Sequence, residues 1–199
     1  MGNMPSPRSD GSAICLVRAS RGTSTGFALV RPEWIVTARH AVAEHPANLP
    51  ISLLFDDGPS LVARVVFRHP RVDLALLELL EPSRCRRPFW PGDCGSGTEG
   101  LVFVGSMPRR STHRGGRPSW AVNPVTFERT TRHRDGYQEQ LFMFRASAVE
   151  PGDSGGPLLA ARGAVAGVVT DGIKIGGEHY VRATSIAPLV EHLGAAVTT

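Results

Sequence analysis

The residues with the clearest capacity for chemistry lie between Glu150 and Leu159, where the sequence reads Glu-Pro-Gly-Asp-Ser-Gly-Gly-Pro-Leu-Leu. Ser154 stands there between an acid and two glycines, after an irregular turn and before an apolar strand. Such a setting presents a hydroxyl nucleophile beside free backbone N–H donors. We interpret Ser154 as a nucleophile, and the alternative is an ordinary turn serine in a glycine-rich hairpin.

A serine hydroxyl is almost fully protonated at neutral pH and needs a base within hydrogen-bond reach. His40 is the candidate among the seven histidines, because it follows the apolar run Trp34 to Val36 in a polar turn. A histidine after a strand more often has a structural role. The presence of Ser154 downstream favours the catalytic interpretation.

The base needs an acceptor on its other ring nitrogen, which holds the imidazole in one tautomer. Asp73 is the candidate, because it opens the otherwise apolar run Leu74 to Leu79. A carboxylate there would be costly to bury without a partner, and an imidazole is such a partner. We therefore expect Asp73 to lie against His40.

Three segments together resemble the trypsin-like (chymotrypsin-fold) serine proteases. They are Gly-Asp-Ser-Gly-Gly-Pro at 152–157, Thr-Ala-Arg-His at 37–40, and Asp-Leu-Ala-Leu-Leu at 73–77, with a glycine–phenylalanine strand at 24–30. The order His, Asp, Ser is the chymotrypsin order, and the resemblance covers about residues 12–195. The spacing from His40 to Asp73 and the lack of cysteines near Ser154 are closer to compact bacterial HtrA-type peptidase domains, here without a PDZ domain.

The resemblance implies a serine endopeptidase that works through an acyl-enzyme. His40 would take the proton of Ser154, the hydroxyl would attack a peptide carbonyl, and Asp73 would steady the imidazolium. The backbone N–H groups of Gly152 and Ser154 would form the oxyanion hole. No cofactor or metal is expected, and the partner is a protein or peptide substrate. The alternative is a catalytically latent or silent module that binds an extended peptide or a partner protein.

The resemblance also points to substrate-binding residues. Thr170, Asp171 and Gly172 resemble the strand that pairs with substrate backbone beside the pocket. Ala148 stands six residues before the nucleophile, where trypsin-type enzymes carry an aspartate, which predicts a small or apolar side chain before the scissile bond. If Glu178 entered the pocket instead, it would favour arginine or lysine.

Control of the activity is a further expectation. In secreted relatives the acid equivalent to Asp153 pairs with a newly freed N-terminus, and no such activation site is recognisable near residue 12. We expect another cation, with Arg109 or Arg110 as hypotheses. An uncleaved protease needs restraint, which predicts an activating partner protein or an ordering of the loops around Gly152.

The elements that must position these residues read as strands. Short runs rich in Val, Ile, Leu and Phe recur between turn signals, with little helical periodicity. They are 13–18, 26–30, 34–38, 51–55, 61–67, 74–79, 101–104, 121–127, 140–144, 157–159, 165–170 and 180–184. The fold class predicted is all-β, with two six-stranded antiparallel β-barrels and a short C-terminal helix from a Ser185 cap to Gly194.

The domain organisation follows from this pattern. We expect a disordered N-terminal segment at 1–11, a first barrel at 12–80, an inter-barrel linker rich in proline and glycine at 81–99, and a second barrel with the helix at 100–199. The three cysteines have no metal-ligand spacing. Cys15 is expected to be a buried apolar residue, and Cys85 and Cys94 to be thiols.

Composition bounds the location and partners. The chain has 199 residues, of which 41% are hydrophobic and 20% charged, and no apolar run is long enough for a membrane span. Met1 to Gly11 has no signal-peptide pattern, so we expect a cytoplasmic protein and no membrane partner.

Lys174 is the only lysine against 21 arginines, a bias typical of a bacterial genome rich in G and C. The formal charge of +4 comes mostly from 109–117 and 129–134, where no aromatic residues alternate with the arginines, so nucleic-acid binding is not expected.

Overall fold

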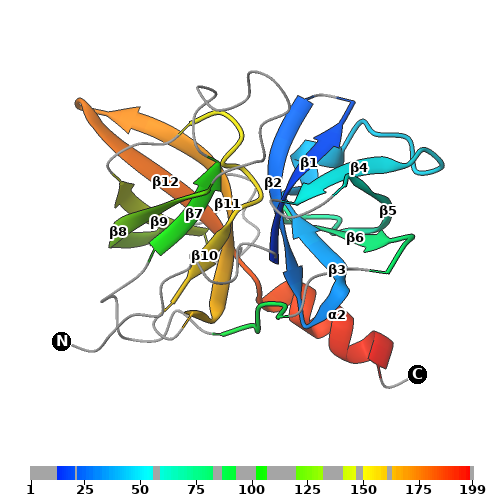
Figure 1. Cartoon of the computed structure of the whole chain (residues 1–199). Helices are drawn as coiled ribbons and strands as arrows, with labels where there is room; N and C mark the ends of the chain where they lie inside the picture. The colour runs from blue at the N-terminus through cyan, green and yellow to red at the C-terminus, as the bar shows by residue number, and fades with distance from the viewer. Residues whose placement is uncertain are drawn as a thin grey trace.

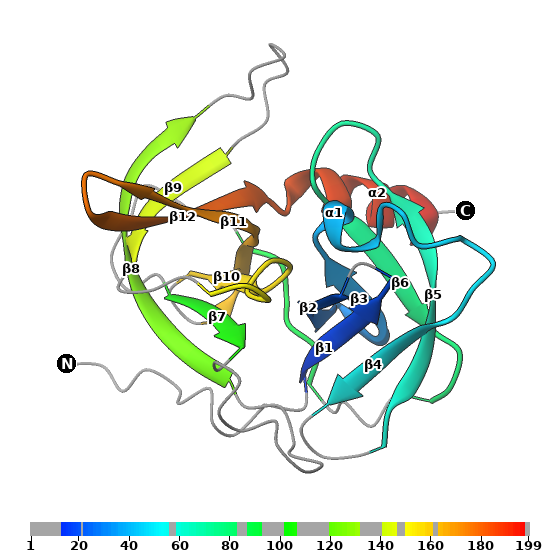
Figure 2. The same ribbon diagram turned by 90° about the horizontal axis from the view of Figure 1, so that it is seen from above.

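The computed structural model describes residues 13–20, 22–55, 59–82, 87–92, 102–106, 120–131, 141–146, 150–160 and 163–197. Two barrels stand side by side, and the C-terminal helix lies against the first of them although it follows the second in sequence (Figure 1). The view from above shows the same arrangement, with the helix beside β5 and β6 (Figure 2). The C-terminal segment of the chain therefore returns from the second barrel to pack against the first.

The first barrel is closed in the order β1-β2-β3-β6-β5-β4, with antiparallel neighbours throughout. Its strands are β1 (Ile14–Ala19), β2 (Gly22–Leu29), β3 (Arg31–Thr37), β4 (Ile51–Phe55), β5 (Leu61–Arg68) and β6 (Ala75–Leu79). Alternate residues of β4, namely Ile51, Leu53 and Phe55, are buried in the barrel core. The short helix α1 (Arg39–Val42) begins directly after β3 and carries His40.

The second barrel is closed in the order β10-β11-β12-β9-β8-β7. Its strands are β7 (Val102–Ser106), β8 (Trp120–Thr131), β9 (Leu141–Ala146), β10 (Pro157–Leu159), β11 (Val165–Ile175) and β12 (Glu178–Ser185). The prediction of an all-β fold with two six-stranded antiparallel barrels is confirmed. β8 and β11 are longer than predicted.

The extra length of β11 comes from a tight hairpin to β12. Ile175 pairs with Glu178, and Gly176 and Gly177 between them have φ of 59° and 91°. Two consecutive positive φ angles define a type I′ turn, whose twist matches that of the flanking strands, so pairing continues up to the turn. The hairpin places residues 171–175 opposite residues 178–182, beside Ser154.

Apolar side chains from both barrels form one shared cluster. Phe27 and Leu74 of the first barrel pack there with Val165 and Val168 of the second. Residues 87–92, part of the predicted linker, run through the junction: the Phe89 N–H donates to Ala28, and the Gly92 N–H donates to Val165. These contacts fix the two barrels against each other.

The C-terminal helix α2 spans Ala187–Val197. The Ser185 hydroxyl accepts a hydrogen bond from the N–H of Ala187, the first residue of the helix, at 3.3 Å. Leu189 and Leu193 are buried in the shared cluster, which confirms the predicted apolar face. The helix continues beyond Gly194, where the prediction ended it, because the next residues favour helix and a single glycine costs only about 1 kcal/mol.

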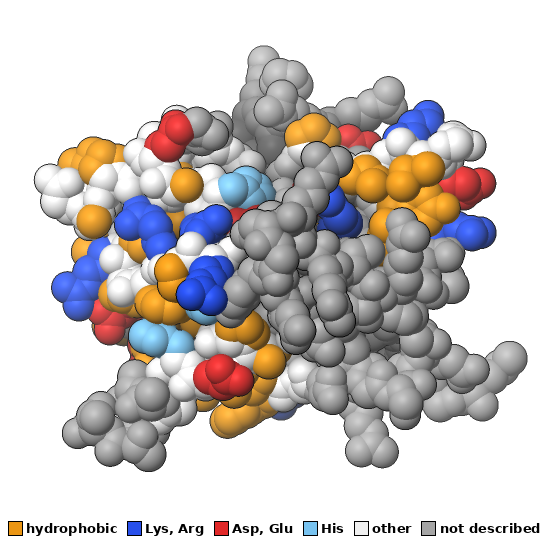
Figure 3. Space-filling view, turned by 180° about the vertical axis from the view of Figure 1, so that it is seen from behind, with side chains coloured by type: hydrophobic (Ala, Val, Ile, Leu, Met, Phe, Trp, Pro, Cys, Tyr) orange, Lys and Arg blue, Asp and Glu red, His pale blue; other side chains and the backbone are white. Residues whose placement is uncertain are grey.

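Several expectations fall outside the described residues: disorder at 1–11, the state of Cys85 and Cys94, and the side chains of the two arginine-rich stretches. Cys15 is buried in the first barrel, as expected. No helix in the described part of the chain is long and apolar enough to cross a membrane. From behind, basic, acidic and apolar side chains are intermixed over the described surface of the first barrel (Figure 3).

Candidate active site

The loop that carries Ser154 is shaped by its own hydrogen bonds. The Asp153 carboxylate accepts from the Glu150 N–H at 2.8 Å, and the Asp153 N–H donates back to the Glu150 carbonyl at 3.1 Å. Asp153 is buried, with 3% of its surface exposed. Gly152 has φ of 108°, a conformation that a residue with a side chain rarely adopts. The glycine and the acid around the nucleophile therefore have separate structural reasons to be present.

The same loop is fastened to the first barrel through Thr25. The Thr25 N–H donates to the Ser154 carbonyl at 2.8 Å, and the Thr25 hydroxyl donates to the Gly152 carbonyl at 2.7 Å. Thr37 in turn donates to the Thr25 carbonyl at 2.7 Å. A Cβ atom on Gly155 would stand 2.0 Å from the Thr25 carbonyl oxygen. The nucleophile loop thus fits against β2 with no room for a side chain.

His40 and Asp73 are in direct contact. His40 Nδ1 lies 2.7 Å from Asp73 Oδ2, and the His40 N–H donates to Asp73 Oδ1 at 2.8 Å. Because an ionised carboxylate only accepts hydrogen bonds, Nδ1 carries the proton and Nε2 is left as the basic nitrogen. The structure therefore brings these two predicted residues together in the tautomer that a general base requires.

The pKa of His40 is raised from its ordinary value of 6.5. The hydrogen bond to Asp73 is the largest cause, and it outweighs the burial of the ring, which lowers the pKa. The negative charges of Asp73 and Asp171 raise it further, while the nearby Arg39 lowers it. Both carboxylates thus favour the imidazolium that forms when the base accepts a proton.

The segment that delivers Asp73 is held by His69 and Arg39, neither of which was predicted. His69 Nδ1 accepts from the N–H groups of Arg71 at 3.2 Å and Val72 at 3.0 Å, which closes the turn just before Asp73. The Arg39 guanidinium donates to the His69 carbonyl at 3.1 Å. The pKa of His69 is lowered, first by burial and then by the positive charges of Arg39, His192 and Arg71.

The Ser154 hydroxyl is engaged by a residue other than His40. Its hydroxyl donates to the Thr170 carbonyl at 2.8 Å, and no hydrogen bond joins it to His40 in the described part of the chain. No bond among the described residues engages the N–H of Gly152 or of Ser154. Among the described residues, these two backbone donors are therefore without a partner, and Ser154 is not hydrogen-bonded to His40.

The three residues predicted on the substrate strand lie at and just after the point where the pairing of β11 with β12 shifts register, between Val169 and Asp171. Thr170 donates its hydroxyl to the Arg182 carbonyl at 3.1 Å. Asp171 forms a two-point ion pair with the Arg182 guanidinium, in which Nε lies 2.6 Å from Oδ1. This pairing accounts for an acid at a position where the family more often has a bulky side chain.

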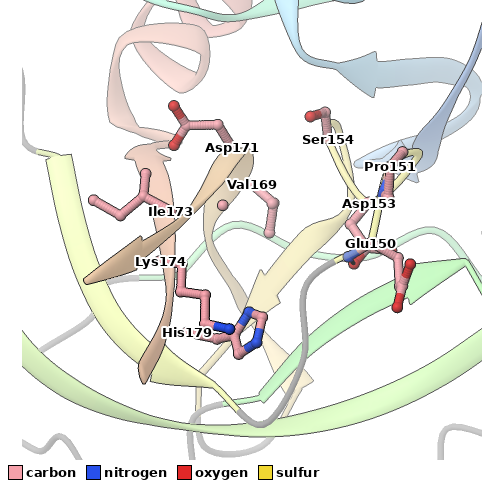
Figure 4. A pocket seen from close by; sticks show the side chains of 10 residues that line it. Glu150, Pro151, Asp153, Ser154, Val169, Asp171, Ile173, Lys174 and His179 are labelled. Atoms are coloured by element: carbon pink, nitrogen blue, oxygen red, sulfur yellow. Dashed lines mark hydrogen bonds between the residues drawn. The ribbon is translucent and has the colours of Figure 1, made fainter. Parts of the chain in front are cut away.

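A pocket with a volume of about 320 Å³ opens beside Ser154, between its loop and the β11–β12 hairpin (Figure 4). It is lined by Glu150, Pro151, Asp153, Ser154, Val169, Asp171, Gly172, Ile173, Lys174 and His179. Ala148 lies outside the described residues, as do Arg109 and Arg110. Glu178 is exposed and does not line the pocket, whereas its neighbour His179 and the cross-strand Lys174 do. Lys174 and His179 were not predicted as pocket residues. The consecutive glycines Gly176 and Gly177 indicate a two-residue turn, from which the pairing of Lys174 with His179 could have been predicted.

Among the described residues, no group of three or more His, Cys, Asp or Glu side chains is placed to hold a metal ion. The described site brings together an imidazole, a carboxylate, a hydroxyl and two backbone N–H groups. This set can carry out nucleophilic attack on a carbonyl once the hydroxyl reaches the base.

Comparison with known proteins agrees with this chemistry. A family model described as trypsin-like peptidase domain matches residues 24–168. Human granzyme M is 28% identical over 193 residues, with 81% of this chain and 70% of that protein covered. A probable periplasmic serine endoprotease DegP-like from Brucella suis biovar 1 is 27% identical over 146 residues, or 73% of this chain, which spans only 27% of that protein. The HtrA-type protease AlgW with decapeptide has the same fold, with a TM-score of 0.72 at 16% identity over 96% of this chain and 66% of that chain.

Proposed function

The chain is a serine endopeptidase that belongs to the family of trypsin-like peptidase domains, and we propose that it hydrolyses peptide bonds through the triad His40, Asp73 and Ser154. The contact of 2.7 Å between His40 Nδ1 and Asp73 is the observation that carries this proposal. It leaves His40 Nε2 as the basic nitrogen on the side of the ring away from the carboxylate. Its partner in the reaction is then the hydroxyl of Ser154.

The mechanism follows from these atoms. His40 Nε2 takes the hydroxyl proton while Ser154 Oγ bonds to the scissile carbonyl carbon, and the carbonyl oxygen becomes an oxyanion. The open N–H groups of Gly152 and Ser154 would donate to that oxyanion, and each such donor contributes roughly 100-fold to 1,000-fold in rate. Collapse of the intermediate breaks the C–N bond, and the leaving amine takes the proton from His40. Water then repeats the sequence on the acyl-enzyme and restores the hydroxyl.

The edge of β11 supports binding of an extended peptide. Asp171 and Gly172 pair with β12 on one side, and no described strand pairs with them on the other. A substrate segment could add there as a strand, with its scissile bond beside Ser154. We propose Thr170, Asp171 and Gly172 as substrate-binding residues on this ground, and Ala148 from the sequence alone.

The hydrogen bond from Ser154 to Thr170 supports a resting enzyme that needs a local change. Catalysis requires that the Ser154 hydroxyl leave the Thr170 carbonyl for His40, and because one hydrogen bond replaces another, the net cost of the exchange would be small. We propose that the change accompanies substrate or partner binding near Gly152, which would regulate the activity.

A fluorophosphonate probe tests the triad, because it reacts only with an activated serine. We expect labelling of the wild-type protein at Ser154 and none in Ser154→Ala or Asp73→Asn, whereas Ser185→Ala, at the cap of α2, keeps it. Equal labelling of wild type and Ser154→Ala would exclude the triad.

The second candidate is a catalytically silent module that grips an extended peptide. The placement of the Ser154 hydroxyl on Thr170, away from the base, is the observation in its favour. A folded wild-type protein that binds a peptide without probe labelling or cleavage, alone or in cell lysate, would select this candidate.

The cytoplasm of a bacterium remains the proposed location, on the composition of the sequence. Fractionation of the source cells with an antibody to the protein tests it, and recovery from the periplasm or the medium would reject it.

A further inference from the structure

A lysine and a histidine share one face of the pocket beside Ser154. Lys174 on β11 and His179 on β12 are direct cross-strand partners, and both line the pocket. Directly opposed residues have Cβ atoms about 5 Å apart, so their side chains act as a unit. Figure 4 shows the Lys174 chain running alongside the His179 ring on the far side of the pocket from Ser154.

The carboxylates around the pocket do not neutralise this pair. Asp171 is engaged by Arg182 through both of its oxygens, and Asp153 is buried and accepts from the backbone of Glu150. Glu150 is exposed, and its carboxylate lies on the opposite side of the pocket from Lys174 (Figure 4). Lys174 forms no ion pair with any residue that the structure describes.

We propose that this pocket receives a carboxylate of the peptide substrate on Lys174 and His179. The proposal rests on the proposed function, because the carboxylate matters only if Ser154 cleaves a bond beside it. The carboxylate belongs either to an acidic side chain near the scissile bond or to the free C-terminus of a short peptide. This differs from the small or apolar side chain predicted from Ala148 and from the basic one that Glu178 would favour.

The physical basis is the cost of leaving a cation without a partner. When a substrate covers the pocket, it removes water from the Lys174 ammonium, and a neutral group in its place would provide no compensating charge. A charge-assisted hydrogen bond from Lys174 to a carboxylate of the substrate would compensate for the lost hydration of the ammonium. Pockets built for a specific polar partner discriminate against analogues that lack it.

Matched peptides test the proposal with the full chain. Pairs that differ only as glutamate against glutamine at each position near the scissile bond are compared, each with a free and an amidated C-terminus. We expect kcat/KM to favour the charged member by about tenfold to a hundredfold. Preference confined to the side chain, or confined to the free terminus, identifies the source of the carboxylate. Equal cleavage of every pair, or cleavage mainly after basic or apolar residues, would overturn the proposal.

Variants assign the preference to the two residues. In Lys174→Gln and in His179→Gln we expect the ratio of kcat/KM between charged and neutral peptides to fall toward one, with Lys174→Arg retaining it. Glu178→Gln on the same hairpin removes a charge outside the pocket and serves as the matched control. A ratio that is unchanged in Lys174→Gln would reject the assignment.

The unusual composition offers a chemical version of the same test. Because Lys174 is the only lysine, amine acetylation reaches this side chain and the chain's N-terminal amine alone. Acetylation removes the charge, whereas reductive methylation keeps it. We expect the preference for the charged peptide to be lost after acetylation and kept after methylation. Fluorophosphonate labelling of Ser154 in the unmodified protein separates the outcomes: a labelled enzyme without the preference overturns only the carboxylate site, and a protein that stays unlabelled both alone and in cell lysate overturns the triad.

Discussion

The hydroxyl of Thr25 donates a hydrogen bond at 2.7 Å to the carbonyl of Gly152, across the junction of the two barrels. The peptide unit on the other side of Gly152 carries the N–H proposed for the oxyanion hole. A glycine backbone can adopt many conformations, and Gly152 has φ of 108° here. By fixing the direction of the Gly152 carbonyl, Thr25 restricts that backbone freedom. A residue of the first barrel thereby holds the peptide backbone beside the N–H that we propose for the oxyanion hole.

The first prediction is that Thr25→Val lowers kcat about tenfold with little change in KM, because a lost oxyanion donor acts on the transition state. The variant has the shape of threonine and keeps the backbone bond to Ser154, so the free energy of unfolding should fall by only about 1 kcal/mol. Thr25→Ser restores the hydroxyl and should restore kcat. Steady-state kinetics and urea unfolding provide both quantities, and a Thr25→Val enzyme with wild-type kcat would show that Gly152 needs no such anchor.

A second prediction concerns Gly155, which has φ of 89° and whose added Cβ would stand 2.0 Å from the Thr25 carbonyl. Gly155→Ala should destabilise the protein by about 2 kcal/mol or more and abolish probe labelling of Ser154, since either the loop or β2 must move. Gly163→Ala is the matched control: it has φ of 78° but nothing within 4 Å. It should cost about 1 kcal/mol and leave labelling intact. Similar losses in both variants would indicate that backbone strain matters and the fit against β2 does not.

The sequence predicted a contact between His40 and Asp73, which the structure shows, because each residue sits in a short segment whose neighbours define its local structure. The barrels followed from the same local signals, the alternation and turns that end each strand. Thr25 was missed because its partner Gly152 is 127 positions away, and no local pattern shows such a contact. Lys174 and His179 were missed for another reason: their pairing depends on the register of the hairpin, which the prediction ended too early.

A third prediction concerns the pH dependence of the reaction. Asp171 raises the pKa of His40, and only neutral His40 can accept the proton of Ser154. Asp171→Asn should therefore lower the pKa of His40 and move the acid limb of kcat/KM to lower pH. Arg182→Gln leaves the Asp171 charge uncompensated and should move the limb in the opposite direction. NMR titration of His40 in a Ser154→Ala background measures the same shifts without turnover. Shifts in one direction for both variants would rule out an electrostatic origin.

The last prediction concerns the turn that delivers Asp73. His69 accepts two backbone hydrogen bonds through Nδ1, and that nitrogen can accept only while it is unprotonated. His69→Leu should lower both stability and kcat by releasing Asp73. His69→Asn should rescue them, because its Oδ1 can accept in place of Nδ1.

The rescue has a pH signature that a purely structural role would not produce. The folded pKa of His69 lies below its ordinary value, owing to burial and the charges of Arg39, His192 and Arg71, with Glu191 acting weakly in the other direction. The unfolded chain therefore binds the proton more readily, so the contribution of His69 to stability is complete above about pH 6.5 and is lost as the pH falls through the folded pKa. His40, with its raised pKa, contributes in the opposite sense, since its stabilisation is complete below about pH 6.5 and is lost as the pH rises through the folded value. Urea unfolding between pH 8 and pH 5 should show that His69→Asn loses less stability on acidification than the wild type. If the two proteins lost stability in parallel, the hydrogen bonds to Nδ1 could not be what holds the Asp73 turn.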